Sequence, residues 1–326
     1  MGIAMRRYDY YLCLTMLLML SSPTAGATAY PDKPIRLVVP YPAGASNEII
    51  GRALGNRLAE QFGRNVIIDT RPGGGGQIGA EIVARSAPDG YTLLLGTAGL
   101  IAISPHVYAK LPYAFSDFAA VSLFASVPYV MAVPAALPVK DVREMVALSR
   151  SKPGWFNYAS SGNASAPHLC GEQLKLLTGA DMTHVPYKGG AAAVADLITN
   201  QVQLYCGGIP TVRAQVQTGR LKIIATTTAQ RSRLMPEQST VAEQGISGFE
   251  VNSWMAILAP AKTPAAVIDR LYAEIAKAMQ RREMQDFVLS QGAEPAALDP
   301  KTTAARFAEE SARWGKVARA AMLRVD

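Results

Sequence analysis

The chain repeats one short pattern: an apolar run, a loop rich in small residues, and then an amphipathic helical stretch. The first copy is the apolar run Ile35 to Pro40, followed by a helical stretch from about Ser46 to Phe62. Val66 to Asp69 and a helical stretch ending near Ser86 form the second copy, and Tyr91 to Thr97 begins a third. Alternation of buried strands with helices of ten or more residues predicts βαβ units and a parallel sheet with helices on both faces.

The same alternation restarts between residues 142 and 227, after a long extended stretch from Val121 to Pro134. A second such stretch runs from Glu250 to Pro260, and the tail from Pro264 to Leu323 is mostly helical. Both extended stretches are too long and too Pro-bounded for ordinary βα units, so we expect each to cross between two domains. The predicted fold is α/β, with two doubly wound domains joined by two crossover strands and a cleft between them. The crossings place lobe 1 at residues 30–126 and 253–326 and lobe 2 at 127–252.

The N-terminus is typical of a secretory signal peptide. Arg6 and Arg7 precede the ten-residue apolar run YLCLTMLLML, and small and turn residues follow it, ending in Ala27-Thr28-Ala29. A membrane anchor is the alternative, but a helix that spans a bilayer needs about 20 apolar residues. We therefore predict export to the periplasm, with cleavage after Ala29, so that 1–29 is the signal peptide.

Composition excludes several classes of protein. The chain has 326 residues, 49% of them hydrophobic, and its formal charge of +7 is spread along the sequence without a basic block. An intrinsically disordered chain and a nucleic-acid partner are therefore not expected. The three cysteines, Cys13, Cys170 and Cys206, form no CxxC pair, and we expect no metal and no cofactor. After loss of Cys13 with the signal, the other two either form one disulfide or stay free.

Two glycine-containing loops follow the first two strands. Gly44 lies in the first, where Ser46 or Asn47 is placed to cap the next helix, and exposed amides at a helix N-terminus favour a carboxylate or phosphate. An ordinary βα turn is the alternative there. The second loop holds a formal G-x-G-x-x-G from Gly74 to Gly79, but no acidic residue ends the next strand, which disfavours dinucleotide binding. We expect Gly75 either to lie close to a ligand at the cleft or to belong to a flexible rim.

A third loop is rich in hydroxyl and amide side chains. It runs from Asn157 to His168 and reads NYASSGNASAPH, with Pro167 starting a helix. This is again an anion-receptive helix N-terminus, now in lobe 2, and with the Gly44 loop it could hold both ends of a dicarboxylate. Ser161 and His168 also suggest a serine hydrolase, but no G-x-S-x-G turn is present, so we expect no catalytic residue.

Three motifs follow one another along the chain: PDGYTLLLGT, ending at Thr97; HVPYKG, starting at His184; and a W-x-x-x-L-A-P crossing that starts at Trp254. In this order they resemble the tricarboxylate-transporter receptor family, also called Bordetella uptake gene proteins. The resemblance extends from about Tyr30 to the C-terminus. It implies a periplasmic-binding-protein (Venus flytrap) fold and a receptor that passes carboxylates to a tripartite tricarboxylate transporter in the inner membrane. Some members act as orphan receptors or sensors.

In that family the first-domain loops and the serine-rich loop hold the ligand carboxylates, largely through backbone amides and bridging waters. Carried across to this chain, the resemblance names Ala43, Gly44, Ala45, Ser46, Thr97, Ser160, Ser161, Asn163, Ser165, His168, Tyr187 and Lys188. Our own interpretation of the loops adds Gly75, Gly207 and Gly208. Partners implied are a small carboxylate and either transporter subunits or a sensor kinase, and we expect a monomer.

The chain departs from the family at two places. It has Ser46-Asn47-Glu48 where members often have Ser-Thr-Asp. It also has Gly207-Gly208 before Ile209-Pro210, where members commonly carry an acidic or amide residue. Without an acid to pair with a ligand ammonium, an amino acid is disfavoured. We expect the two glycines to leave room for a bulkier body, so the predicted ligand is a di- or tricarboxylate or an aromatic carboxylate. A secreted enzyme acting on carboxylates is the alternative from another class.

Overall fold

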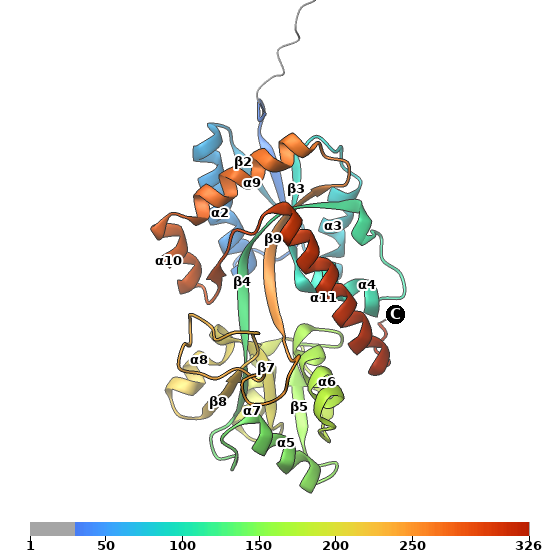
Figure 1. Cartoon of the computed structure of the whole chain (residues 1–326), viewed down its shortest axis with the longest axis vertical. Coiled ribbons are helices and arrows are strands. Elements are labelled where there is room, and N and C mark those ends of the chain that lie inside the picture. The colour runs from blue at the N-terminus through green and yellow to red at the C-terminus, as the bar shows by residue number, and fades with distance from the viewer. Residues whose placement is uncertain (1–29, 326) are drawn as a thin grey trace, which may run out of the picture.

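The structure is a computed structural model that describes residues 30–325. The predicted signal peptide, 1–29, lies outside the described residues. Figure 1 shows two lobes, one above the other, with the crossover strands β4 (Phe118–Pro134) and β9 (Asn252–Pro260) between them. Within 30–325, no helix combines the length and the apolar character needed to cross a membrane.

The upper lobe, lobe 1, is built on a sheet of order β2-β1-β3-β9-β4, with β10 on the far side of β4. Strands β1 to β3 are mutually parallel in the order β2-β1-β3, whereas β9 is antiparallel to both β3 and β4. Its remaining strands and its long helices are β1 (Ile35–Val39), β2 (Val66–Thr70), β3 (Thr92–Thr97), β10 (Glu294–Pro295), α2 (Ser46–Phe62), α3 (Gln77–Ala84), α9 (Ala265–Met279), α10 (Arg282–Ser290) and α11 (Pro300–Ala320).

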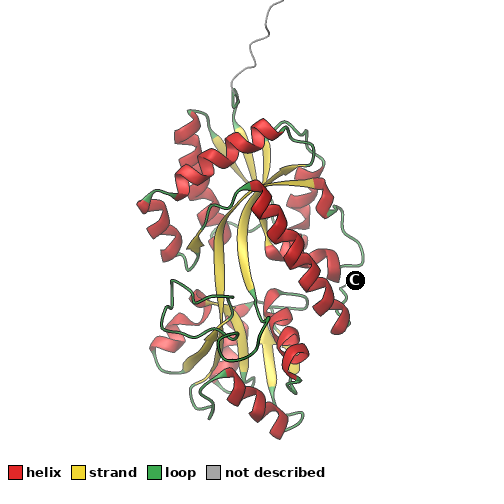
Figure 2. Ribbon diagram, viewed as in Figure 1, coloured by secondary structure: helices red, strands yellow, loops and turns green. Residues whose placement is uncertain are grey.

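The lower lobe, lobe 2, has a sheet of order β6-β5-β7-β4-β8, in which β5 is parallel to both of its neighbours. Helices flank this sheet as they do in lobe 1 (Figure 2). The elements are β5 (Asn157–Ser160), β6 (Thr183–Pro186), β7 (Leu204–Gly208), β8 (Leu221–Thr226), α5 (Val142–Ser151), α6 (Ala166–Thr178), α7 (Gly190–Ile198) and α8 (Ile209–Gln217).

Strand β4 belongs to both sheets. Its first part, up to Pro128, pairs with β9, and from Tyr129 onward it pairs with β7 and with β8. Strand β9 begins at this point, where Ser253 lies opposite Val127. The chain therefore crosses between the lobes where the pairing of β4 changes, which is the position expected for a hinge.

Strand burial explains why the apolar runs have no alternating polar residues. Val38 and Val39 of β1 and Leu94 and Leu95 of β3 have no exposed surface, because helices cover both faces of the sheet. A side-chain carbon added at Gly51 of α2 would lie only 2.3 Å from Leu95 Cδ1, so this glycine lets the helix lie close to the sheet.

A disulfide joins Cys170 of α6 to Cys206 of β7. Both cysteines are buried in the core of lobe 2. The bond ties the helix that follows the serine-rich loop to the strand that ends at Gly208. Of the two alternatives that the cysteine spacing left open, a disulfide or two free thiols, the structure has the disulfide.

The α/β fold with two lobes is confirmed, but several local elements differ from expectation. Helix α8 was not predicted, nor were the π-helical turn Gly99–Ile103 and the short α4 (Ser104–Val107) that follow β3. The glycine run includes a 3₁₀ turn at Gly74–Gly76, and a second such turn lies at Phe115–Asp117. These elements are short or lack a clear apolar period, which is the signal on which the other assignments rest.

Candidate ligand-binding cleft

Two adjoining compartments lie between the lobes, of about 520 Å³ and about 220 Å³. Four residues line both of them: Asn47 from lobe 1, Tyr129 on β4, and Ser161 and Pro167 from lobe 2. The larger compartment is also lined by Tyr41, Gly75, Thr97, Gly99, Ser104, Tyr108, Asn163, Ser165 and Ser253. The smaller one is also lined by Ser46, Ile50, Val127, Tyr205, Gly207, Gly208, Pro210, Thr211, Met255, Gln291 and Ala293.

Helix N-termini contribute residues to the lining from both lobes. From lobe 1 come Ser46, the first residue of α2, and Gly99, the first of the π-helical turn. From lobe 2 come Ala166, the first residue of α6, and Thr211 in the first turn of α8. The first N–H groups of a helix have no partner within the helix, and the aligned peptide dipoles place partial positive charge there. The cleft is therefore suited to an anion.

Among the described residues, those that line the two compartments include no aspartate, glutamate, lysine, arginine or histidine. The titratable groups there are tyrosines, and burial raises the pKa of Tyr41 and of Tyr205 to about 12 and raises the pKa of Tyr129 further. These phenols stay protonated at neutral pH and can donate a hydrogen bond. The cleft thus offers neutral donors to an anion and no carboxylate to a cation.

The serine-rich loop is held by its own side chains. Ser160 Oγ donates to the Gly162 carbonyl (2.9 Å) and accepts from the Gly162 amide (3.1 Å). Ser165 is the N-cap of α6: its Oγ accepts from the His168 amide and donates to the Gly162 carbonyl. These bonds fix the backbone between β5 and α6 and leave Ser161 and Asn163 at the cleft.

Beneath this loop, the rings of His168 and His184 are stacked, with centroids 3.6 Å apart and planes within 8° of parallel. His168 Nδ1 accepts from the Ala164 amide at 3.0 Å, and His184 Nε2 lies 2.7 Å from Ser160 Oγ. Because the Ser160 hydroxyl proton goes to the Gly162 carbonyl, we assign His184 Nε2 as the donor. Burial lowers the pKa of both histidines, and that of His184 falls to about 4. The pair is therefore neutral near pH 7 and supports the loop.

Of the residues proposed from the sequence, eight line the compartments: Ser46, Gly75, Thr97, Ser161, Asn163, Ser165, Gly207 and Gly208. Seven do not: Ala43, Gly44, Ala45, Ser160, His168, Tyr187 and Lys188. Ser160 and His168 are buried beneath the loop, Tyr187 Oη donates to Asp196, and Lys188 is exposed.

The first loop differs from expectation in its capping. We expected Ser46 or Asn47 to cap α2, but the N-cap is Ala45, and no side chain caps the helix there. Ser46 and Asn47 are instead the first two helical residues. The buried Glu48 accepts from the Gly44 amide at 3.2 Å and from Arg52 Nε at 2.7 Å. The Gly44 amide is thus already bonded, and Asn47 lines both compartments.

The expectation that Gly207 leaves room for a bulky ligand is wrong. A side-chain carbon added at Gly207 would lie 2.4 Å from Cε1 of Tyr205, so the protein's own phenol ring fills that space. At Gly208 the nearest atom would be Pro210 Cδ, at 3.7 Å. Of these two glycines, Gly208 alone leaves its side-chain space open beside the cleft.

The lining residues that were not predicted from the sequence include Asn47, Tyr129, Tyr205 and Ser253. Tyr129 and Ser253 lie at the crossing of β4 and β9, and Tyr205 lies two residues before Gly207 on β7. The predicted crossings were a usable signal, because residues at a hinge between two lobes border the cleft. No group of three metal-ligating side chains is present within 30–325.

The fold and this cleft define a two-lobed solute-binding protein. The family model described as tripartite tricarboxylate transporter family receptor matches residues 50–323. The chain belongs to this family, whose members are periplasmic solute-binding receptors. The UPF0065 protein in the tcbD–tcbE intergenic region of Pseudomonas sp. strain P51 is 34% identical over 89% of this chain and 86% of its own length. BugT of Bordetella pertussis is 32% identical over 92% of each chain.

Solved structures agree with this assignment. An R. palustris protein with adipate is 33% identical, with a TM-score of 0.77, over 91% of this chain and all of that one. MatC from Rhodopseudomonas palustris, with bound malate, is 27% identical, with a TM-score of 0.71, over 88% of this chain and 99% of that one. The predicted family and fold are confirmed.

Proposed function

We propose that the protein captures a small carboxylate without an amino group, either a di- or tricarboxylate or an aromatic carboxylate, between its lobes. The observation that carries this proposal is the lining of the cleft. Neutral hydroxyl and amide donors and helix N-termini favour an anion, and an ammonium group would find no carboxylate among the lining residues. The relatives solved with adipate and with malate support the class of ligand.

We further propose that the loaded receptor delivers its ligand to a tripartite tricarboxylate transporter in the inner membrane. The family description supports this role. Presentation to a sensor kinase is the alternative. In this proposal the chain is exported by residues 1–29, cut after Ala29, and works as a periplasmic monomer. Its lobes comprise 30–126 with 253–326, and 127–252.

A thermal-shift screen followed by calorimetry tests the ligand class. We expect adipate, malate, citrate or benzoate to raise the melting temperature, and aspartate and glutamate to leave it unchanged. Tight binding of aspartate or glutamate, with no binding of the unsubstituted dicarboxylates, would overturn the proposal. Unchanged ligand recovered after incubation distinguishes a receptor from an enzyme.

An enzyme acting through Ser161 and His168 is less well supported. His168 Nδ1 is bonded to the Ala164 amide, and its ring is stacked on His184. Within the serine-rich loop, the serine whose hydroxyl lies against a histidine ring is Ser160, which has no exposed surface and whose proton is already donated to Gly162. A nucleophile needs an accessible hydroxyl with a base to accept its proton.

A further inference from the structure

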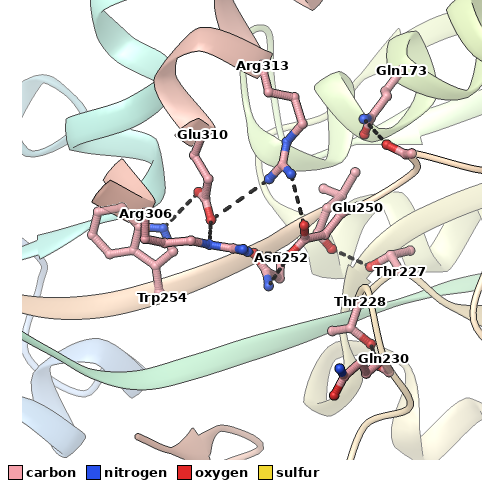
Figure 3. A network of polar contacts seen from close by, with 12 residues as sticks. Gln173, Thr227, Thr228, Gln230, Glu250, Asn252, Trp254, Arg306, Glu310 and Arg313 are labelled. Carbon is pink, nitrogen blue, oxygen red and sulfur yellow. Dashed lines mark hydrogen bonds and ion pairs between the residues drawn. The ribbon is translucent and has the colours of Figure 1, made fainter. Parts of the chain in front are cut away.

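Helix α11 lies on the face of the crossover strands opposite the cleft. Ser253 and Met255 of β9 line the cleft, and side chains alternate along a strand, so Trp254 between them points the other way. Its ring stacks on Phe307 of α11, with centroids 4.3 Å apart, and its Nε1 donates to Glu310 at 2.8 Å. Figure 3 shows this side of the hinge.

Several contacts fix α11 to lobe 1. The Leu123 amide of β4 donates to Thr303 Oγ1 at 3.0 Å, and His106 Nε2 lies 2.8 Å from Ser311 Oγ. Glu310 is fully buried between Trp254 and Arg306. The helix therefore moves with lobe 1.

The same helix reaches lobe 2 through Glu250. This residue precedes Val251, whose amide donates at 2.8 Å to the carbonyl of Thr227, the residue that follows β8. The Glu250 carboxylate accepts from Arg306 and, at 2.9 Å, from Arg313, both on α11 (Figure 3). Although burial alone raises its pKa, the two guanidinium groups hold the pKa of Glu250 below its usual value.

Helix α11 also contacts helix α6 of lobe 2, further from the hinge. The C-terminal part of α11 and the helix α6 of lobe 2 flank a groove of about 350 Å³, lined by Glu172, Lys175, Leu176, Val317, Ala320, Ala321 and Met322. In Figure 1 the end of α11 comes down beside α6. The first turn of α6 carries Pro167, which lines the cleft, so one helix joins the ligand loop to this back contact.

We propose that α11 is a brace behind the hinge, and that its contacts with Glu250 and α6 oppose closure of the cleft. If the lobes close about β4 and β9, surfaces on the opposite face must move apart. Contacts there are therefore stronger in the open state, and they set the fraction of molecules that is closed without ligand. This inference rests on the proposed function, because closure around a ligand gives the brace its effect on affinity.

The effect of the brace on the apparent dissociation constant follows from the fraction of ligand-free molecules that are closed. The apparent dissociation constant equals the intrinsic one divided by the fraction of molecules in the competent state. If about a tenth of the free molecules are closed, complete loss of the brace lowers the apparent constant by up to about tenfold.

Two variants weaken the brace in different ways. Glu250→Gln removes the charge that Arg306 and Arg313 contact, and Ala320→Trp places a ring in the groove between α6 and α11. The matched controls are Glu274→Gln and Ala308→Trp. Glu274 is 8% exposed and pairs with Arg270 at 3.0 Å within helix α9, and Ala308 is an exposed alanine on α11 away from the groove.

Small-angle X-ray scattering of the ligand-free variants tests the inference without any ligand. We expect both test variants to have a smaller radius of gyration than the wild type, and calorimetry with adipate to give an apparent Kd about three- to tenfold lower. Both controls should match the wild type. An unchanged radius of gyration in both test variants would overturn the inference and leave the proposed function standing. Compaction without binding of any carboxylate would support the brace and contradict the proposed function.

Discussion

The phenol ring of Tyr205 lies over two glycines, Gly207 and Gly190. A side-chain carbon added at either one would lie within 2.5 Å of the ring or its hydroxyl. Tyr205 is almost fully buried and forms part of the wall of the smaller compartment. The two glycines therefore determine where the ring lies, and the ring limits the width of the cleft.

Gly207→Ala should displace this ring and destabilise the fold. We expect a loss of about 1–3 kcal/mol in the free energy of unfolding, because extra volume in a packed region forces side chains from their preferred positions. Gly208→Ala is the matched control, since its added carbon would meet only Pro210 at 3.7 Å. Urea denaturation measures both, and equal stability of the two variants would contradict this account of Tyr205.

Ser161 borders both compartments, so a bulky side chain there should block the ligand. We expect Ser161→Trp to abolish detectable binding of adipate or malate in calorimetry while its melting temperature stays near the wild-type value. Ser151→Trp, at an exposed position on α5, should bind normally. Wild-type affinity in Ser161→Trp would refute the placement of the ligand.

Lowering the pH should reduce the folding stability of lobe 2, because it protonates the stacked histidines. Burial and the nearby His168 and Lys175 lower the pKa of His184 to about 4, with Glu172 opposing, whereas a histidine in the unfolded chain has a pKa of about 6.5. Between these pH values the unfolded chain binds the proton and the folded chain does not, so stability is lost as pH falls from about 6.5 to about 4. Because His184 is only half-buried, we expect a contribution on the order of 1–2 kcal/mol.

His184→Gln tests this pH dependence, since glutamine can still donate to Ser160 but does not titrate. Its free energy of unfolding should change less with pH than that of the wild type between pH 6.5 and 4. Equal pH slopes for the two proteins would show that the stacked pair has no part in acid sensitivity.

Among elements, α6 is the most constrained. Its N-cap, Ser165, ends the serine-rich loop, and the disulfide from Cys170, in the second turn of the helix, joins α6 to β7. The Cys170→Ala and Cys206→Ala double variant should lose about 3–4 kcal/mol in the free energy of unfolding. Without the bond, the unfolded chain regains the conformational entropy of a loop closed by residues 36 apart. Chemical denaturation with and without a reductant measures the loss. Wild-type stability in the double variant would contradict it.

Helices and strands in which apolar residues follow a clear pattern could be predicted from the sequence. Helix α2 begins and ends at the predicted residues, 46 and 62, and the crossover strands were found because each apolar stretch was too long for a βα unit. Helix α8 was missed although Pro210 in its first turn is a helix-start signal. The π-helical turn Gly99–Ile103 is apolar throughout, so no period marked it.

The candidate site was only partly predictable for a related reason. Loops after strands could be identified locally, and Ser46 and Ser161 were found in this way, whereas Thr97 was named by the family resemblance. Tyr129 lies on β4, and its position at the cleft depends on where the pairing of β4 changes from β9 to β7 and β8. Contacts between distant strands are set by the whole fold and cannot be derived from neighbours in sequence.

For the molecule as a whole, ligand binding should favour the closed arrangement. Asn47 of lobe 1 and Ser161 of lobe 2 each line both compartments, so one ligand can contact both lobes. We expect saturating adipate to decrease the radius of gyration in small-angle scattering. Ser161→Trp should not compact, and a wild-type radius that is the same with and without bound ligand would exclude hinge closure.

The order of the strands determines which lobe can fold first as the chain is synthesised. Strand β9 lies between β3 and β4, so the sheet of lobe 1 lacks an inner strand until residues 252–260 have been synthesised. Lobe 2 is different, because β4 through β8 are complete in a nascent chain that ends at residue 251. A contiguous lobe can fold as a unit, whereas pairing across more than 150 residues is slow. Lobe 2 is therefore the part able to fold first, while lobe 1 must wait for the C-terminal helices to emerge.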